Sequence, residues 1–185
     1  GMHVRRAQSW LNEDLDRLEE RVGVAEVQLK VQLTGPITLA STIALQRGER
    51  AIADQGALRD IALAHREVVS AHIRDVRRRL PGSVLTVQVD EPAMDGALRG
   101  VLPRQSGFGK LRAIESSIAG ELHTRIVDVI VEAGATPWLH ACAPNWLLEL
   151  ALKAGYRGIS ADFSLLTDAD EDALGTAIER NITIA

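Results

Sequence analysis

Residues 84–92 of the chain have the sequence VLTVQVDEP, and this stretch decides the fold class. Its first six residues are mostly β-branched and apolar, which is typical of a buried strand. Asp90, Glu91 and Pro92 then end the strand. An apolar stripe at helical spacing runs from residue 58 to residue 80 and stops at a Pro-Gly pair, so we expect a long helix to lead directly into this strand.

Strands and helices alternate along the rest of the chain in the same way. Strands are predicted at 27–33, 84–89, 138–142 and 158–162, with another beginning in 181–185, and helices at 10–22, 38–46, 58–80, 111–130, 145–153 and 168–180. This alternation indicates α/β class with a parallel sheet, because parallel neighbours need a covering helix between them. About five strands fall short of a complete (β/α)8 barrel, which takes about 250 residues. We therefore expect one domain over 1–185, either a small open sheet or part of a TIM-type barrel.

The composition and net charge of the chain restrict the kinds of partner that we expect. Apolar residues make up 46% of the chain and charged residues 25%, as in ordinary globular proteins. The formal net charge of −4 gives no overall attraction for nucleic acid or for anionic membranes, so neither is an expected partner. Three consecutive arginines, Arg77 to Arg79, lie in the last turn of the long predicted helix, where they complement its dipole. We prefer that interpretation to a nucleic-acid patch.

The location that we expect is cytoplasmic. Apolar stretches are shorter than the roughly 20 residues of a membrane span, and no secretory signal begins the chain. Cys142 is the single cysteine, so a disulfide within the chain is excluded. Gly1, which precedes a methionine, resembles a remnant of tag removal.

Candidate site residues follow the predicted strands, because the loops at the carboxyl ends of parallel strands build the pockets of α/β folds. His140 and Cys142 give the sharpest signal. Residues two apart on an extended backbone point to the same side, so their imidazole and thiolate could reach one zinc ion. A small buried cysteine without a metal is the alternative interpretation.

Two carboxylates give the next signal. Pleating sends the adjacent Asp90 and Glu91 to opposite sides, and one of them could hold a substrate ammonium group. The alternative is that they cap the next helix or pair with Arg99 or Arg104. Asp162 also ends a strand and is either a ligand or a helix cap.

Other notable side chains have structural interpretations. His65, His72 and His123 lie on or beside apolar helical stripes and are predicted to be core or boundary residues, whereas His3 lies in a start that lacks regular pattern. The tryptophans, Trp10, Trp138 and Trp146, are scattered and are predicted to serve packing.

Four motifs in order, TGPIT at 34–38, VQVDEPA at 87–93, HAC at 140–142 and SADFS at 160–164, resemble the catalytic barrel of cobalamin-independent methionine synthase. The resemblance covers roughly 27–166 and implies a zinc-dependent methyltransferase that moves a methyl group from a folate donor to a thiol such as homocysteine. It further implies that His140 and Cys142 bind zinc and that Asp90, with Glu91, binds the amino acid. Thr34 and Gly35 of the TGPIT loop would line the same pocket.

The chain also departs from this family. The family's zinc-binding glutamate falls near Thr167, and no glutamate follows until Glu171. Its other zinc cysteine, its catalytic histidine and its first strands have no counterpart here. We therefore expect an incomplete barrel whose open edges are covered by a second copy, another chain or the amino-terminal helix.

Three functions stay open at this point. The first is a methionine-synthase-like enzyme, which would be inactive if the truncated barrel lacks catalytic parts. The second is another thiol methyltransferase of the same superfamily. The third is a non-catalytic binding or assembly module with a vestigial site.

Overall fold

The computed structural model describes residues 1–46, 48–142, 147–165 and 167–185. Five strands are present in the described residues: β1 (Val27–Thr34), β2 (Ser83–Asp90), β3 (Thr136–His140), β4 (Gly158–Ser160) and β5 (Thr183–Ile184). The α-helices described are α1 (Met2–Val22), α2 (Pro36–Thr42), α3 (Gln55–Arg79), α4 (Met94–Leu98), α5 (Ser116–Glu132), α6 (Leu148–Ala154) and α7 (Asp168–Glu179). Two short 3-10 turns, η1 (Ala51–Ala53) and η2 (Phe163–Leu165), complete the set of described helical elements. The predicted alternation of strand and helix is confirmed.

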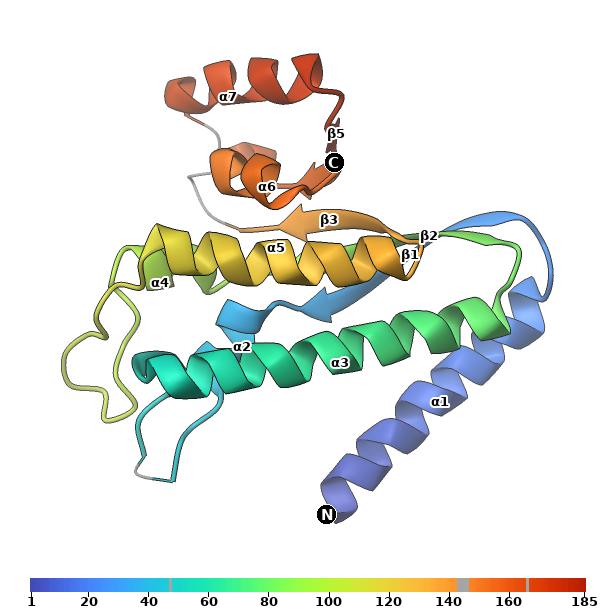
Figure 1. Cartoon of the computed structure of the whole chain (residues 1–185), viewed down its shortest axis with the longest axis horizontal. Helices are drawn as coiled ribbons and strands as arrows, with labels where there is room; N and C mark the ends of the chain where they lie inside the picture. The colour runs from blue at the N-terminus through green and yellow to red at the C-terminus, as the bar shows by residue number, and fades with distance from the viewer. Residues whose placement is uncertain (47, 143–146, 166) are drawn as a thin grey trace.

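The five strands form one parallel sheet in the order β1-β2-β3-β4-β5 (Figure 1). Each strand pairs with its successor in the chain, whereas a doubly wound sheet reverses its strand order at a switch point. Sequential order is the arrangement of a barrel. The fold is therefore α/β, with five parallel strands arranged as in a partial barrel.

Strand alternation gives the sheet two chemically different faces. On the apolar face Leu85, Val87 and Val89 of β2, Leu139 of β3 and Ile159 of β4 are buried in the hydrophobic core. The opposite face, called here the polar face, carries Lys30, Gln32 and Thr34 of β1, Thr86, Gln88 and Asp90 of β2, and Trp138 and His140 of β3. The β1 side chains of the polar face are exposed.

Helices α3 and α5 lie side by side over the apolar face, with α6 beside α5 (Figure 1). They supply core residues such as Val69, Ile73, Ile126 and Ile130. The Asp54 side chain caps α3 by accepting a hydrogen bond from the Ala57 amide at 2.8 Å, which satisfies a backbone donor that the first turn leaves free. Helices that cover one face of a sequential sheet are again typical of a barrel wall.

Helix α1 begins eight residues before the predicted start, so the expectation that His3 lies in an irregular segment is wrong. The helix is anchored to α3 by the buried Leu15 and by Arg79, which pairs with Asp16 and Glu19. The triple arginine therefore lies in the last turn of α3 as predicted and also ties two helices together. Trp10 is 55% exposed, with the Arg6 guanidinium stacked over its ring, so its predicted packing role is wrong.

Several predicted boundaries differ from the structure, among them the ends of α2, which spans Pro36–Thr42 where 38–46 was predicted, and of β4, which ends at Ser160 where 162 was predicted. The apolar stripe from 111 predicted a helix that in fact starts at Ser116, because Leu111 instead donates its amide to Leu102 O beside an antiparallel bridge that closes the loop between them. The strand predicted for 138–142 ends at His140, which places Cys142 beyond it. Trp146 and the predicted start of α6 at 145 lie outside the described residues.

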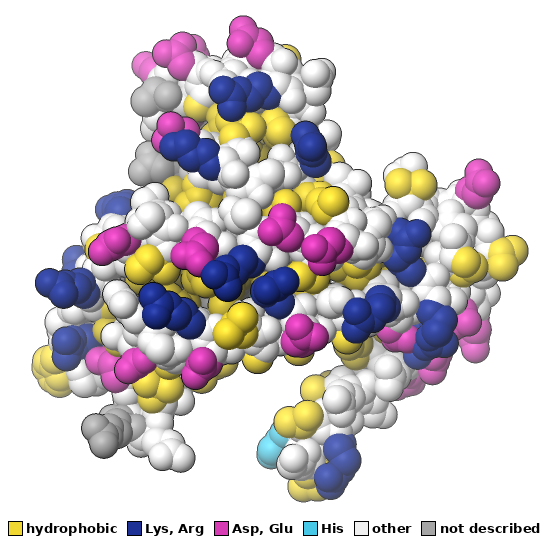
Figure 2. All heavy atoms as spheres, viewed as in Figure 1, with side chains coloured by type: hydrophobic (Ala, Val, Ile, Leu, Met, Phe, Trp, Pro, Cys, Tyr) yellow, Lys and Arg dark blue, Asp and Glu magenta, His cyan; other side chains and the backbone are white. Residues whose placement is uncertain are grey.

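Acidic and basic side chains are interspersed over the helical side of the molecule (Figure 2). Several of them pair along one helix, as Arg125 does with Glu121. Among the described residues, no helix combines the length and the apolar character that crossing a bilayer requires.

Candidate active site at the carboxyl ends of the strands

The sheet register brings the predicted site residues into one row. Thr34 pairs with Asp90, Asp90 with His140, and His140 with Ser160 across four adjacent strands. Two backbone hydrogen bonds extend this row into the loops, from the Gly35 amide to Asp90 O and from the Glu91 amide to His140 O, each at 2.8 Å. We call this row and its loops the rim. Its first two members, Thr34 and Asp90, come from motifs that are more than 50 residues apart in the sequence. The pairing of the parallel strands alone aligns them.

His140 and Cys142 contact each other at the rim. His140 Nδ1 lies 2.9 Å from Ser160 O, and because a carbonyl oxygen only accepts, Nδ1 carries the proton. In the neutral ring Nε2 therefore carries the lone pair and can accept the thiol proton of Cys142, whose Sγ lies 2.7 Å away. A histidine whose second nitrogen donates to a backbone carbonyl is the usual arrangement of a metal ligand. Cys142 itself is exposed and unpaired by any disulfide.

Asp90 lies on the polar face, half-buried, beside His140. Its Oδ1 accepts a hydrogen bond from Gln88 Nε2 at 2.8 Å. The two arginines that were alternative partners are engaged elsewhere: Arg99 pairs with Asp95, and Arg104 lies 3.9 Å from Glu49. Asp90 therefore keeps its carboxylate at the rim.

Glu91 points to the opposite side, as the pleat predicts, and is 1% exposed. Its carboxylate accepts hydrogen bonds from the Ile37 amide at 3.0 Å, from the Thr38 amide at 2.8 Å and from Thr38 Oγ1 at 2.6 Å. Glu91 thus caps α2, a helix from an earlier part of the chain, and not the helix that follows it. This geometry supports a role in holding the TGPIT loop against the Asp90 strand, with its oxygens engaged inside the protein.

Gly35 is required by this contact. A Cβ built on Gly35 would lie 2.2 Å from Glu91 Oε1, closer than real Cβ atoms approach any atom. The Gly35 backbone has φ −75, which any residue adopts, so the constraint is steric and not conformational. Thr34 and Gly35 are therefore part of the rim, and Gly35 lets the Glu91 carboxylate reach α2.

A buried polar cluster lies behind Glu91, and the contacts within it were not predicted from the sequence. His123 Nε2 lies 3.3 Å from Glu91 Oε1, and His123 Nδ1 lies 2.8 Å from the Tyr156 hydroxyl. Burial raises the pKa of Tyr156 well above its usual range, and the Glu91 charge adds to this effect. Burial also lowers the pKa of His65, although the Glu91 carboxylate and a backbone hydrogen bond with Thr34 oppose the shift. The buried positions of His65 and His123 confirm their predicted core placement.

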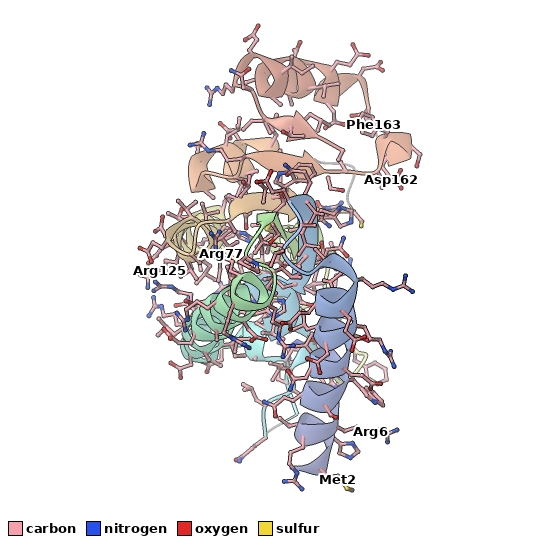
Figure 3. The ribbon with its side chains drawn as sticks, turned by 90° about the vertical axis from the view of Figure 1, so that its right-hand side faces the viewer. Met2, Arg6, Arg77, Arg125, Asp162 and Phe163 are labelled. Atoms are coloured by element: carbon pink, nitrogen blue, oxygen red, sulfur yellow. The ribbon has the colours of Figure 1, made fainter. Side chains whose placement is uncertain are left out.

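Asp162 follows β4 but turns into its own loop. Its Oδ1 accepts hydrogen bonds from the Ser164 amide at 2.9 Å and from Ser164 Oγ at 2.6 Å, and these bonds lower the pKa of the carboxyl group. Figure 3 shows Asp162 on the other side of the molecule from Arg77 and Arg125 of the helical layer. Within the described ranges, no three His, Cys, Asp or Glu side chains gather closely enough to hold a metal ion. His140 and Cys142, the two zinc ligands predicted from the sequence, thus contact each other without a third such side chain among the described residues.

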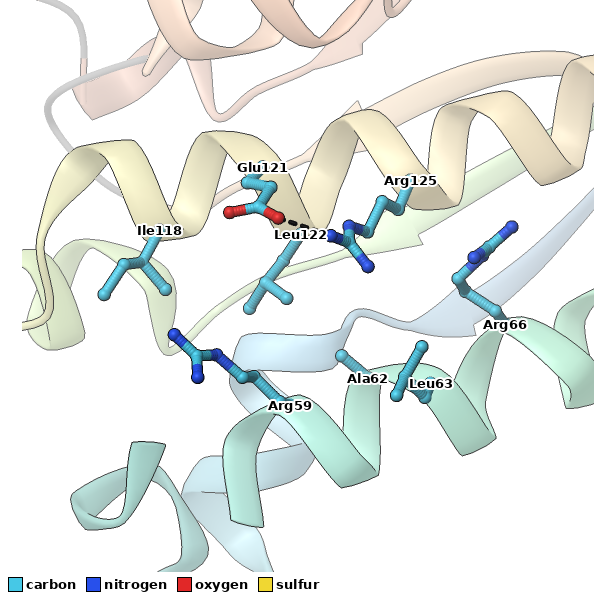
Figure 4. A pocket seen from close by; sticks show the side chains of 8 residues that line it. All are labelled: Arg59, Ala62, Leu63, Arg66, Ile118, Glu121, Leu122 and Arg125. Carbon is cyan, nitrogen blue, oxygen red and sulfur yellow. Dashed lines mark hydrogen bonds and ion pairs between the residues drawn. The ribbon is translucent and has the colours of Figure 1, made fainter. Parts of the chain in front are cut away.

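A separate cavity of about 110 Å³ lies between α3 and α5 (Figure 4). Its lining combines apolar residues with arginines, one of which, Arg125, pairs with Glu121. None of the rim residues lines this cavity, which lies in the helical layer. It is distinct from the candidate site.

Comparison with known proteins adds no assignment: no family model matches the sequence, and no curated protein matches it significantly.

Proposed function

We propose that the rim is a zinc-dependent, thiol-activating site of the cobalamin-independent methionine synthase kind. Its reaction would transfer a methyl group from a folate donor to a thiol amino acid such as homocysteine. The observation that carries this proposal is the contact between His140 Nε2 and Cys142 Sγ, one strand away from the Asp90 carboxylate. A single small ligand with an ammonium group and a thiol could meet both, because neighbouring strands are only about 4.8 Å apart.

His140 and Cys142 would hold the zinc ion. The Ser160 carbonyl fixes the protonated nitrogen of His140 and leaves the other nitrogen facing Cys142. The two ligand atoms are in direct contact at 2.7 Å and would move apart to about 3.5 Å to share a tetrahedral zinc ion. Bound zinc supplies one chemical effect, a lowered pKa of the substrate thiol, so that a thiolate is available at neutral pH. The exposed thiol of Cys142 also suits a reducing compartment, and we place the protein in the cytoplasm.

Asp90 would bind and orient the ammonium group of the substrate. Its carboxylate is half-buried at the rim, where a charge-assisted hydrogen bond is stronger than in open water. Thr34 and Gly35 line the same rim, and Glu91 holds their loop in place from inside. Three functions, metal binding, ammonium binding and loop positioning, would thus be divided among adjacent strand ends.

The alternative is a non-catalytic binding or assembly module, and one observation favours it. The described residues offer two zinc ligands and no third, while the site of an active zinc enzyme has three protein ligands. In this alternative the polar face is covered by a second copy or by another chain, and the motifs of the rim are vestigial. Another thiol methyltransferase of the same superfamily would use the rim as proposed above, with a different acceptor.

Methyl transfer from methyltetrahydrofolate to homocysteine, measured with the zinc-loaded protein, tests the proposal. Asp90→Asn should raise the KM for homocysteine more than it lowers kcat, because it removes binding of the ammonium group. Asp128→Asn, an exposed carboxylate on α5, is the matched control. Absence of turnover together with a dimer mass by light scattering would contradict the enzyme and support the assembly module.

A further inference from the structure

A chain of hydrogen bonds on the polar face leads to Asp90. Lys30 Nζ of β1 donates to Gln88 Oε1 at 2.9 Å, and Gln88 Nε2 donates to Asp90 Oδ1 at 2.8 Å. Lys30 is exposed, whereas Gln88 is 2% exposed. The chain therefore runs from a solvated ammonium group, through a buried amide, to the carboxylate at the rim.

Lys30 and Asp90 together determine the orientation of the Gln88 amide. An amide group has a donor end and an acceptor end, and a lysine ammonium group only donates. The contact therefore fixes the Gln88 oxygen toward Lys30 and the Gln88 NH₂ group toward Asp90. Without Lys30 the Gln88 oxygen loses its donor, and the Asp90 carboxylate alone is left to hold the amide group in this orientation.

Lys30 is itself held in place by Trp138. Its Nζ lies 5.9 Å from the centroid of the Trp138 ring, within reach of a cation–π attraction. The ring lies over β4 at Gly158, where an added Cβ would come within 2.4 Å of it. Trp138 also pairs with Gln88 in the ladder, so the ring and the amide are neighbours.

The intervening amide keeps the Lys30 charge from neutralising Asp90 directly. A lysine in direct contact with Asp90 would compete with a ligand ammonium group, whereas Gln88 transmits only a hydrogen bond. Asp90 Oδ1 is taken by Gln88, and Oδ2 makes no hydrogen bond with the residues that the structure describes. Oδ2 is thus the oxygen left for a ligand.

We propose that Lys30 and Gln88 are positioning residues that orient the Asp90 carboxylate toward a primary ammonium group and thereby select amino thiols over plain thiols. This inference rests on the proposed function, since it takes Asp90 as the ammonium-binding residue. The inference about Lys30 and Gln88 and the proposed function can fail separately, and two experiments distinguish these failures.

The first experiment observes the Gln88 side-chain amide by ¹⁵N NMR, with its signals assigned by their loss in Gln88→Met. Lys30→Met should shift these signals and speed their exchange with solvent, and Lys30→Arg should restore them. Lys153→Met, which removes an exposed lysine paired with Glu149 on α6, is the matched control. Unchanged Gln88 signals in Lys30→Met would overturn the inference, whatever the protein binds.

The second experiment measures binding of two probes to the zinc-loaded protein by calorimetry. L-homocysteine carries the ammonium group, and 4-mercaptobutyrate is the same thiol acid without it. Lys30→Met should weaken the binding of L-homocysteine by about tenfold, which is the effect of one misdirected charge-assisted hydrogen bond. The affinity for 4-mercaptobutyrate should be unchanged. Lys30→Arg should restore most of the loss.

The outcomes separate the two claims. If Asp90→Asn weakens only L-homocysteine and Lys30→Met weakens neither probe, the inference is overturned and the proposed function stands. If the wild-type protein binds both probes equally, the proposed role of Asp90 fails, and selection by Lys30 and Gln88 fails with it.

Discussion

Glu91 and His123 form a pair at the centre of the protein, where Glu91 Oε1 lies 3.3 Å from His123 Nε2 and neither side chain is accessible to solvent. The pair joins the strand end that carries Asp90 to helix α5. Because Glu91 also caps α2, one carboxylate links three elements around the rim. The stability of the fold and the geometry of the candidate site therefore depend on the same side chain.

Glu91→Gln should destabilise the protein by about 2–4 kcal/mol, because the new NH₂ group would face backbone donors that now point at a carboxylate oxygen. Urea unfolding measures the change. The matched control is Glu121→Gln on α5, whose exposed side chain pairs with Arg125 and should change stability by no more than about 0.5 kcal/mol. Equal stabilities of the two variants would show that the Glu91 network contributes nothing.

Gly35→Ala should also destabilise, because its Cβ would displace the Glu91 carboxylate from α2. We expect a loss similar to that of Glu91→Gln, with the two changes together costing less than their sum. Gly120→Ala is the control, since Gly120 lies in the second turn of α5 and nothing is within 4 Å of its added Cβ. That variant should gain about 0.5–1 kcal/mol in free energy of unfolding. A fully additive double variant would contradict a shared mechanism.

His65 should make the fold less stable in mild acid. Its pKa is lowered in the folded state, mainly by burial, so the unfolded chain takes up the proton first. Stability is then complete above the ordinary histidine pKa of about 6.5 and falls as the pH drops below it. His72 has a pKa that burial lowers in the same direction. Urea midpoints at about pH 7.5 and 5.5 should therefore differ less in His65→Gln than in the wild type.

His3→Gln is the control for this experiment, because His3 lies exposed on α1. It should leave the difference between the two midpoints unchanged. Equal acid sensitivity of His65→Gln and the wild type would rule out His65 as a contributor.

Much of the fold could be predicted because it depends on local patterns. Alternation at 27–33 and the β-branched run at 84–89 each produced a strand within a residue or two of its true ends. Boundaries failed where a tertiary contact competed with the pattern. Leu111 has helical spacing, but its amide bonds to Leu102 O before α5 begins.

The candidate site could be predicted in part. Strand order and register place Asp90 beside His140, and both facts follow from a parallel sheet with sequential strands. The Glu91 cluster could not be found in this way, because Tyr156 and His123 are 33 residues apart and meet only after α5 packs on the sheet. The same holds for Lys30, whose partner Gln88 is 58 residues away.

Metal content after zinc loading and desalting tests the central claim most directly. The account predicts about one zinc ion per chain, lost in Cys142→Ser and in His140→Gln and retained in Asp162→Asn, whose carboxylate bonds to Ser164 in its own loop. A wild-type protein without zinc, or a Cys142→Ser variant that retains it, would contradict the account.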